Sequence, residues 1–248
     1  MKIYLLFMFL FQFGTLIAGT IDPNVSDQKY IEYGKHFPYV GELCGTYENK
    51  TLFCASAVVL KPNYIITAAH VVEGYKSCTI TIKNKSYVVE SLTWPTEFKS
   101  NIFGENDLAV GFIKEAIKLD FYPELYEKED EIGKVCCIAG YGFTGNFFTG
   151  AKTFDTKRRG GSNIIEEIEK QLLICRPSKQ NDHTRTSLEF LIASGDSGGG
   201  LFIDGKLAGI NSCVSGIGKN STNSTYNSES GHTRISIHRK WILKNIKD

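Results

Sequence analysis

The chain has 248 residues, of which 42% are hydrophobic and only 6 are prolines, so it can bury a sizeable core and does not belong to the disordered class. Its formal net charge of +1 gives no field that would attract nucleic acid or an anionic membrane, and we expect neither as a partner. No Pro-, Gly- or Ser-rich linker divides the sequence, which predicts one compact unit, with room for two similar halves.

The N-terminus has the features of an export signal. A basic start precedes an apolar run over residues 3–17, and three small residues follow it. An apolar stretch too short to span a bilayer comfortably, with a small-residue exit, is typical of a cleaved signal peptide. We therefore predict a signal peptide over residues 1–19 and a secreted, extracellular domain over residues 20–248 with no stable membrane anchor. The alternative is an uncleaved anchor, because the run lies near the lower length limit of a membrane span.

Two further features agree with export. Seven cysteines suit an oxidising compartment, although an odd number leaves at least one unpaired in a monomer. Five segments match the N-glycosylation acceptor pattern, which predicts a glycoprotein; they begin at Asn24, Asn49, Asn84, Asn220 and Asn223.

One disulfide can be argued from local pattern. Cys44 and Cys54 stand symmetrically about a polar turn, flanked by strand-like runs. Side chains facing each other across two paired strands come close enough to bridge. The alternative is a pair of buried thiols. No group of Cys and His residues has zinc-ligand spacing, so we expect no metal site.

Short apolar runs broken by turn residues dominate the chain after residue 36. Runs of this length, rich in Val, Ile, Thr and aromatic residues, are typical of the strands of a β-barrel or β-sandwich. We therefore predict a mostly β fold. The predicted strands cover residues 37–43, 52–60, 64–67, 78–82, 87–92, 108–113, 134–139, 187–192, 201–203 and 207–210.

Helical patterns are confined to two places. Residues 164–174 alternate glutamates with apolar residues and fit either an amphipathic helix or a strand with one charged face. Residues 237–246 place apolar side chains at near-helical spacing among lysines, which predicts a C-terminal helix. Between the predicted strands, the basic residues 157–159 precede two glycines and predict a solvated loop that is open to proteolytic nicking.

Residues 195–199, with the sequence Gly-Asp-Ser-Gly-Gly, carry the strongest chemical signal. A serine hydroxyl is a weak nucleophile, so acyl-transfer enzymes hold it on a tight turn beside a base and surround it with backbone N–H groups. Glycines around Ser197 let the backbone approach a scissile carbonyl without a Cβ in the way. Taken alone, the segment also fits a Gly-rich hairpin turn.

Two other residues can supply the base and the acid that orients it. His70 follows a strand-like run, so its imidazole would project from the end of a strand. Asp107 lies just before an apolar strand, where a carboxylate can be buried against an imidazole. Taken alone, His70 also fits a structural histidine, and Asp107 also fits an ordinary Asn-Asp turn. The order His, Asp, Ser is much more specific, because it belongs to one of several unrelated folds that converged on this triad.

The sequence resembles the chymotrypsin/trypsin family of serine proteases. The matching blocks are residues 67–70 (Thr-Ala-Ala-His), 106–109 (Asn-Asp-Leu-Ala) and 195–199, and weaker matches at 140–142 and 241–242 extend the resemblance over residues 37–246. It implies an all-β, chymotrypsin-like fold of two six-stranded antiparallel β-barrels. The halves would meet near residues 120–133, with the active site in the cleft between them.

The resemblance also implies a role for each residue. His70 would act as general base and later acid, Asp107 would orient it, and Ser197 would attack to form an acyl-enzyme. The backbone N–H groups of Gly195 and Ser197 would form the oxyanion hole. Ser212 matches the serine that supports the buried aspartate and begins the strand along which substrate lies.

The chain departs from the family pattern in its specificity pocket. Trypsin-like members carry an aspartate six residues before the nucleophile, where this chain has Leu191, followed by Ile192. Val214 stands where a glycine usually leaves the pocket open. We therefore expect a shallow apolar pocket that accepts small or medium aliphatic side chains, and not cleavage after Lys or Arg.

Activation and disulfides depart as well. Family zymogens expose an N-terminal ammonium group that pairs with the aspartate before the nucleophile, here Asp196. No Ile-Val-Gly-Gly-like terminus is present, and Ile21 would supply the ammonium group if the signal were cut after Thr20. The family's usual cysteines beside the histidine and after the serine are replaced by Val71 and Ile203, so its standard disulfides cannot be carried over.

Two other classes of function are alternatives. The nucleophile segment also fits the Gly-x-Ser-x-Gly elbow of an α/β-hydrolase esterase, which needs alternating strands and helices and a later histidine, His232 or His238. A non-catalytic, protease-like binding protein would keep the scaffold, although such proteins usually lose a triad residue. For the protease, we expect protein or peptide substrates, no cofactor and a monomer.

Overall fold

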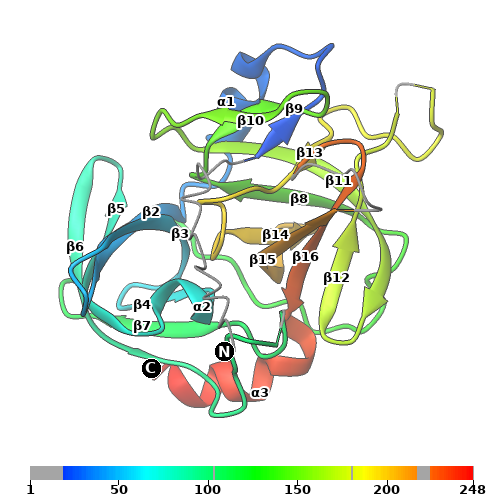
Figure 1. The fold of residues 1–248 in the computed structure, drawn as a ribbon. Helices are drawn as coiled ribbons and strands as arrows, with labels where there is room; N and C mark the ends of the chain where they lie inside the picture. The colour runs from blue at the N-terminus through cyan, green and yellow to red at the C-terminus, as the bar shows by residue number, and fades with distance from the viewer. Residues whose placement is uncertain (1–18, 103, 180, 217–223, 248) are drawn as a thin grey trace, which may run out of the picture.

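The computed structural model describes residues 19–102, 104–179, 181–216 and 224–247. Most elements in this part of the chain are strands, and they close into two six-stranded antiparallel barrels that lie side by side in Figure 1, with a C-terminal helix beneath them. The predicted all-β, two-barrel fold is confirmed. Among the described residues, no helix is long and apolar enough to cross a membrane.

The first barrel closes in the strand order β2-β3-β4-β7-β6-β5. In β3, six consecutive residues from 55 to 60 are buried, because one face of the strand lines the barrel and the other packs toward the second barrel. Cys44 and Cys54 are directly paired across β2 and β3 and form a disulfide, which confirms the predicted bridge. The strands are β2 (Val40–Tyr47), β3 (Leu52–Lys61), β4 (Tyr64–Thr67), β5 (Tyr75–Ile82), β6 (Lys85–Thr93) and β7 (Ala109–Ile113).

The second barrel closes in the order β11-β12-β16-β15-β14-β8. Between β7 and β8 the chain crosses from one barrel to the other over residues 114–134. Buried polar side chains line part of this barrel, including Asn163, Asn211 and His232. The strands are β8 (Val135–Gly140), β11 (Arg159–Glu169), β12 (Leu172–Cys175), β14 (Gly200–Ile203), β15 (Lys206–Gly216) and β16 (Ser228–Arg234).

The helical interpretation of residues 164–174 is wrong, and the strand interpretation is correct. The segment forms the end of β11, a turn at Lys170 and the strand β12. A bulge between Ile165 and Glu167 shifts the register of β11 against β12. One extra residue interrupts the two-residue alternation, so the apolar positions imitate helical spacing in the sequence.

A small four-stranded sheet joins the N-terminal arm to the second barrel. Its order is β10-β9-β1-β13, so β1 lies between two strands from much later in the chain. The strands are β1 (Thr20–Ile21), β9 (Thr144–Asn146), β10 (Gly150–Thr153) and β13 (Phe190–Leu191). Helix α1 (Asp27–Gly34) follows β1 and packs on β11, above the small sheet in Figure 1. None of these N-terminal elements was predicted.

Two further helices complete the fold. The short α2 (Ala69–Val72) follows β4 directly. The predicted C-terminal helix is confirmed as α3 (Ile235–Asn245), which buries Ile235, His238 and Ile242. These residues lie at positions i, i+3 and i+7, one face of an α-helix, and α3 packs that face toward β15.

Candidate active site

The structure brings His70, Asp107 and Ser197 together from three separate segments. His70 lies on α2, one turn beyond the end of β4, and Asp107 lies two residues before β7. Ser197 lies on the loop between β13 and β14 of the second barrel. The site therefore forms where the two barrels meet. His70 projects from a helical turn and not from the strand itself, a small change from the sequence prediction.

The three side chains form a continuous hydrogen-bonded chain. The Nδ1 atom of His70 lies 2.7 Å from Oδ2 of Asp107, and its Nε2 atom lies 3.1 Å from Oγ of Ser197. The backbone N–H of His70 also donates to Oδ1 of Asp107 at 2.8 Å. Both carboxylate oxygens thus hold the same residue, which fixes the ring with one nitrogen facing the serine.

Asp107 is a buried carboxylate whose charge is well compensated. It is 2% exposed, and the hydroxyl of Ser212 donates to Oδ2 at 2.5 Å. Burial alone would raise the pKa of Asp107, but the bonds from His70 and Ser212 outweigh it and hold the pKa below its usual value. The Thr233 hydroxyl donates to the backbone carbonyl of Asp107 at 3.0 Å. Ser212 therefore lies where the family resemblance implies, whereas Thr233 was missed.

The loop around Ser197 leaves two backbone donors unused. The N–H groups of Gly195 and Ser197, the predicted oxyanion hole, have no acceptor among the described residues. Neighbouring N–H groups are all engaged: those of Asp196, Gly198 and Gly199 donate to backbone carbonyls at 2.8–3.1 Å. These two N–H groups flank Asp196, and one belongs to Ser197 itself. A developing oxyanion beside the serine hydroxyl requires such free donors.

Ser56, on β3 of the first barrel, supports this loop and was missed by the sequence analysis. Its N–H donates to the carbonyl of Ser197 at 2.9 Å, and its hydroxyl donates to the carbonyl of Gly195 at 2.9 Å. The same hydroxyl accepts the N–H of Tyr141 at 2.8 Å. Ser56 lies inside an apolar run, and nothing local in the sequence distinguishes it from a core residue.

Asp196, next to the nucleophile, is a second buried carboxylate. Its oxygens accept the N–H groups of Gly142 at 2.9 Å and Ala193 at 3.1 Å, and the backbone of Gly19 lies beside the same carboxylate. Burial raises the pKa of Asp196 to about 6, and these donors only partly offset it. Within the described part of the chain, no side-chain cation pairs with it. The residue that reaches Asp196 is thus Gly19, two positions before the expected Ile21, which is paired inside the small sheet.

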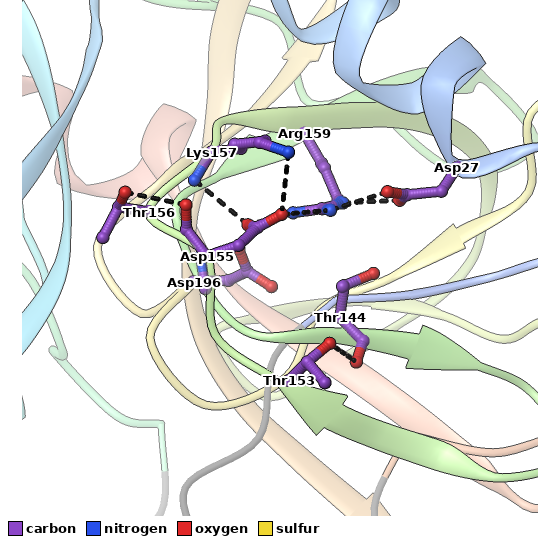
Figure 2. A network of polar contacts seen from close by, with 9 residues as sticks. Asp27, Thr144, Thr153, Asp155, Thr156, Lys157, Arg159 and Asp196 are labelled. Atoms are coloured by element: carbon purple, nitrogen blue, oxygen red, sulfur yellow. Dashed lines mark hydrogen bonds and ion pairs between the residues drawn. The ribbon is translucent and has the colours of Figure 1, made fainter.

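A polar network lies beside Asp196, shown in Figure 2. Arg159 is 3% exposed and forms ion pairs with Asp27 of α1 and with Asp155. Arg158 donates to the carbonyls of Gly34 and Val40 at 2.7 and 2.8 Å. The expected solvated loop at residues 157–159 is therefore wrong for the two arginines, because both are bound to the N-terminal segment.

A cleft of about 380 Å³ opens beside the triad. Three of the predicted substrate-binding residues line it: Ile192, Ser212 and Val214. The fourth, Leu191, is fully buried in β13, paired with Thr20, and does not line the cleft. Asp107 is the one carboxylate among the lining residues, and it is engaged with His70. The other lining residues are Phe98, Ser100, Ile102, Gly104, Ala193, Ser194, Cys213 and Ser224, together with His70 and Ser197.

The histidines required by an α/β-hydrolase site lie elsewhere. His232 bonds to Asn211 at 2.9 Å and to Ser230 at 3.0 Å, and burial lowers its pKa to about 3. His238 faces the core from α3. With a two-barrel fold and neither histidine bonded to Ser197, the α/β-hydrolase arrangement is excluded.

Comparison with known proteins assigns the family. The model of the family described as Trypsin matches residues 32–242. The chain belongs to the trypsin family. A search of curated proteins found no match.

Solved structures show the same fold for this trypsin-family chain. A protein described as HL collagenase superposes with a TM-score of 0.68 at 17% identity, covering 86% of this chain and 95% of its own. Neuropsin, described as a serine protease expressed in the limbic system of mouse brain, superposes with a TM-score of 0.66 at 18% identity. The match covers 85% of this chain and 95% of neuropsin. A protein described as GrC superposes with a TM-score of 0.66 at 16% sequence identity, covering 86% of this chain and 95% of its own. The family and the fold support a protease function.

The turn after the nucleophile yields a stability prediction. Gly198 has φ +83°, and a Cβ there would lie 2.0 Å from Oγ1 of Thr67 and 2.2 Å from the Ser56 carbonyl. Gly205 has a similar φ of +76° but open space around it. We expect Gly205→Ala to cost about 1–2 kcal/mol from backbone strain alone. Gly198→Ala adds overpacking and should cost roughly 2–5 kcal/mol. Denaturant unfolding measures both, and equal losses would contradict this account.

Proposed function

We propose that the chain is a secreted serine endopeptidase that hydrolyses peptide bonds through a His-Asp-Ser triad and an acyl-enzyme intermediate. The observation that carries the proposal is His70, whose two ring nitrogens are within hydrogen-bond reach of Asp107 and Ser197. The two unused N–H groups next to Ser197 add the second requirement for acyl transfer, a site for negative charge.

The proposed reaction proceeds in two halves. Ser197 Oγ attacks the scissile carbonyl carbon while Nε2 of His70 takes its proton, and the N–H groups of Gly195 and Ser197 bind the oxyanion. His70 then gives the proton to the leaving amine, and the acyl group stays on Ser197. Water, deprotonated by His70, attacks the acyl-enzyme; the bond to Ser197 Oγ then breaks, His70 returns the proton to Oγ, and the acid is released. Asp107 stays ionised throughout and stabilises the charged imidazole.

We propose a preference for small or medium aliphatic side chains at the residue before the scissile bond. Ile192, Ala193 and Val214 give this side of the cleft an apolar surface. With the cleft's single carboxylate bound to His70, a substrate lysine or arginine would be desolvated without a partner, which costs several kcal/mol. Trypsin-like cleavage is therefore disfavoured.

The N-terminal contact suggests where the mature chain begins. The backbone of Gly19 lies beside the buried carboxylate of Asp196, which forms no ion pair with a side chain in the described residues, although the charge of Arg159 lowers its pKa. Cleavage between Ala18 and Gly19, one residue before the predicted boundary, would place an ammonium group there and balance that charge. Removal of the leader would then complete the site without a separate activation step.

Glycosylation is consistent with the proposed secretion, because Asn24, Asn49 and Asn84 are exposed. Asn220 and Asn223 lie outside the described residues.

The mechanism is tested by active-site labelling. The secreted protein should react with a fluorophosphonate probe and cleave casein, and both activities should vanish in Ser197→Ala, because the variant lacks the hydroxyl that forms the proposed acyl-enzyme. Circular dichroism confirms that the variant is folded. A correctly processed wild type that neither labels nor cleaves would favour a protease-like binding protein, and labelling with ester but no peptide hydrolysis would favour an esterase.

Specificity is tested with a mixed peptide library read by mass spectrometry. We expect cleavage after Ala, Val and similar residues to exceed cleavage after Lys or Arg by at least about tenfold, given the unpaired charge. Val214→Gly should widen the pocket and admit larger apolar side chains, with Ser100→Ala, a substitution of another residue that lines the cleft, as a control. A profile dominated by Lys and Arg would reject the apolar pocket.

The mature terminus is tested by N-terminal sequencing of secreted protein. We expect Gly-Thr-Ile-Asp, which starts at Gly19. Protein that retains extra residues before Gly19 should show a lower kcat, because the ammonium group is displaced from Asp196. Sequence that starts at Thr20 or Ile21 in fully active protein would refute the inference.

A further inference from the structure

Arg159 joins two carboxylates from opposite parts of the sequence. Its Nε and one Nη donate to Asp27 at 2.6 and 2.7 Å, and its two Nη atoms donate to Asp155 at 2.8 and 2.9 Å (Figure 2). Both pairs use the planar guanidinium fork, which a lysine cannot reproduce. The hydrogen bonds and charge of Arg159 hold the pKa of Asp155 at about 2. Lys157 also pairs with Asp155 at 3.5 Å, but Arg159 is the residue that binds both carboxylates.

Asp27 is the first residue of α1, so Arg159 fixes the N-terminal end of that helix. One turn along the helix, Tyr30 is fully buried, and its hydroxyl accepts the N–H of Asp22 at 3.3 Å. The Tyr30 ring also contacts Phe190 of β13, with ring centroids 6.3 Å apart. The helix thus holds the chain immediately after β1 and packs on the strand to which β1 is paired.

From β1 the contacts continue to the nucleophile. Ile21 pairs with Phe190, and the backbone of Gly19, just before β1, lies beside the Asp196 carboxylate, where a Cβ on Gly19 would come within 3.0 Å of Oδ2. Asp196 lies between Gly195 and Ser197, whose N–H groups form the proposed oxyanion hole. A displacement of the Asp196 backbone would move the peptides on either side of it.

Asp155 holds the other side of the same small sheet. It follows β10, which pairs with β9, and β9 pairs in parallel with β1. Arg159 therefore binds the segments on both sides of β1, the helix after it and the hairpin beside it.

We propose that Arg159 is a positioning residue for the nucleophile loop. By fixing Asp27 and Asp155, it keeps β1 in the small sheet and the Gly19 backbone beside Asp196, and so maintains the Gly195–Ser197 backbone that would bind the oxyanion. The proposal rests on the proposed protease function. It assigns the N-terminal arm, residues 19–34, a role in catalysis although none of its side chains reaches the triad in the described contacts.

The neighbouring arginine provides a matched control. Arg158 also binds the arm, but at the opposite end of α1, through the Gly34 carbonyl. Arg158→Gln therefore weakens the packing of the helix without releasing its first residue or Asp155. A purely structural role for the arginines predicts similar effects of the two substitutions, whereas the proposal predicts a difference in kcat.

The test compares full-length secreted variants, assayed below their unfolding temperatures. For Arg159→Gln we expect kcat to fall about 10- to 100-fold with KM within about threefold, because oxyanion contacts act on the transition state. Arg159→Lys should lower kcat to a similar extent as Arg159→Gln, since binding both carboxylates requires the planar guanidinium group and a positive charge alone does not suffice. Asp27→Asn should lower kcat in the same direction. Arg158→Gln should keep kcat within about twofold of wild type.

Hydrogen exchange separates this proposal from the proposed function. In Arg159→Gln, amides of residues 19–21 and 193–197 should exchange faster than in wild type and in Arg158→Gln, whether or not the protein is an enzyme. The positioning role would be overturned if these amides exchange in Arg159→Gln at the wild-type rate. Equal losses of kcat in Arg159→Gln and Arg158→Gln would overturn it as well. Failure of wild type to label with fluorophosphonate would overturn the protease proposal and leave the exchange result as the test of the arm.

Discussion

The buried carboxylate of Asp107 is the interaction on which the arrangement of the two barrels depends. It accepts bonds from His70 on the first barrel and from Ser212 on the second, and its carbonyl accepts a bond from Thr233. A carboxylate this deeply buried is tolerated only when its oxygens are satisfied, so both barrels must dock in one register. The same register brings Ser197 to the free nitrogen of His70. Stability of the interface and geometry of the candidate site therefore have one cause.

Support for the nucleophile loop comes from three directions. Ser56 holds it from the first barrel, the N–H of Gly142 holds Asp196 from the loop after β8, and the N-terminal arm reaches the same carboxylate through Gly19. Each contact fixes backbone close to the two unused N–H groups. Two N–H groups without acceptors favour a change in the backbone conformation of this loop that would satisfy them. The three contacts oppose such a change.

The sequence predicted the parts of the fold that follow local rules. Apolar runs predicted most strands, and the symmetric placement of two cysteines about a turn predicted the Cys44–Cys54 disulfide. Three short motifs identified His70, Asp107 and Ser197, which lie together at the candidate site. It missed β16, because the strand consists of Ser, Glu, Gly, His, Thr and Arg and is buried through hydrogen bonds instead of apolar packing. Arg159 was misplaced for a related reason. Its partner Asp27 lies 132 residues away, and no spacing rule connects them.

The division of the triad between two barrels also has a consequence for the order of synthesis. The pair of His70 and Asp107 belongs to a barrel that is complete by residue 113, long before Ser197 has been translated. The second barrel closes only with β16, which ends at Arg234, and Thr233 on that strand contacts Asp107. In the proposed protease, a nascent chain that ends between the two barrels would therefore carry the base without the nucleophile. Under the proposed function, the site for hydrolysis would form only after both barrels have been synthesised, because the nucleophile and the residues that complete the second barrel come late in the chain.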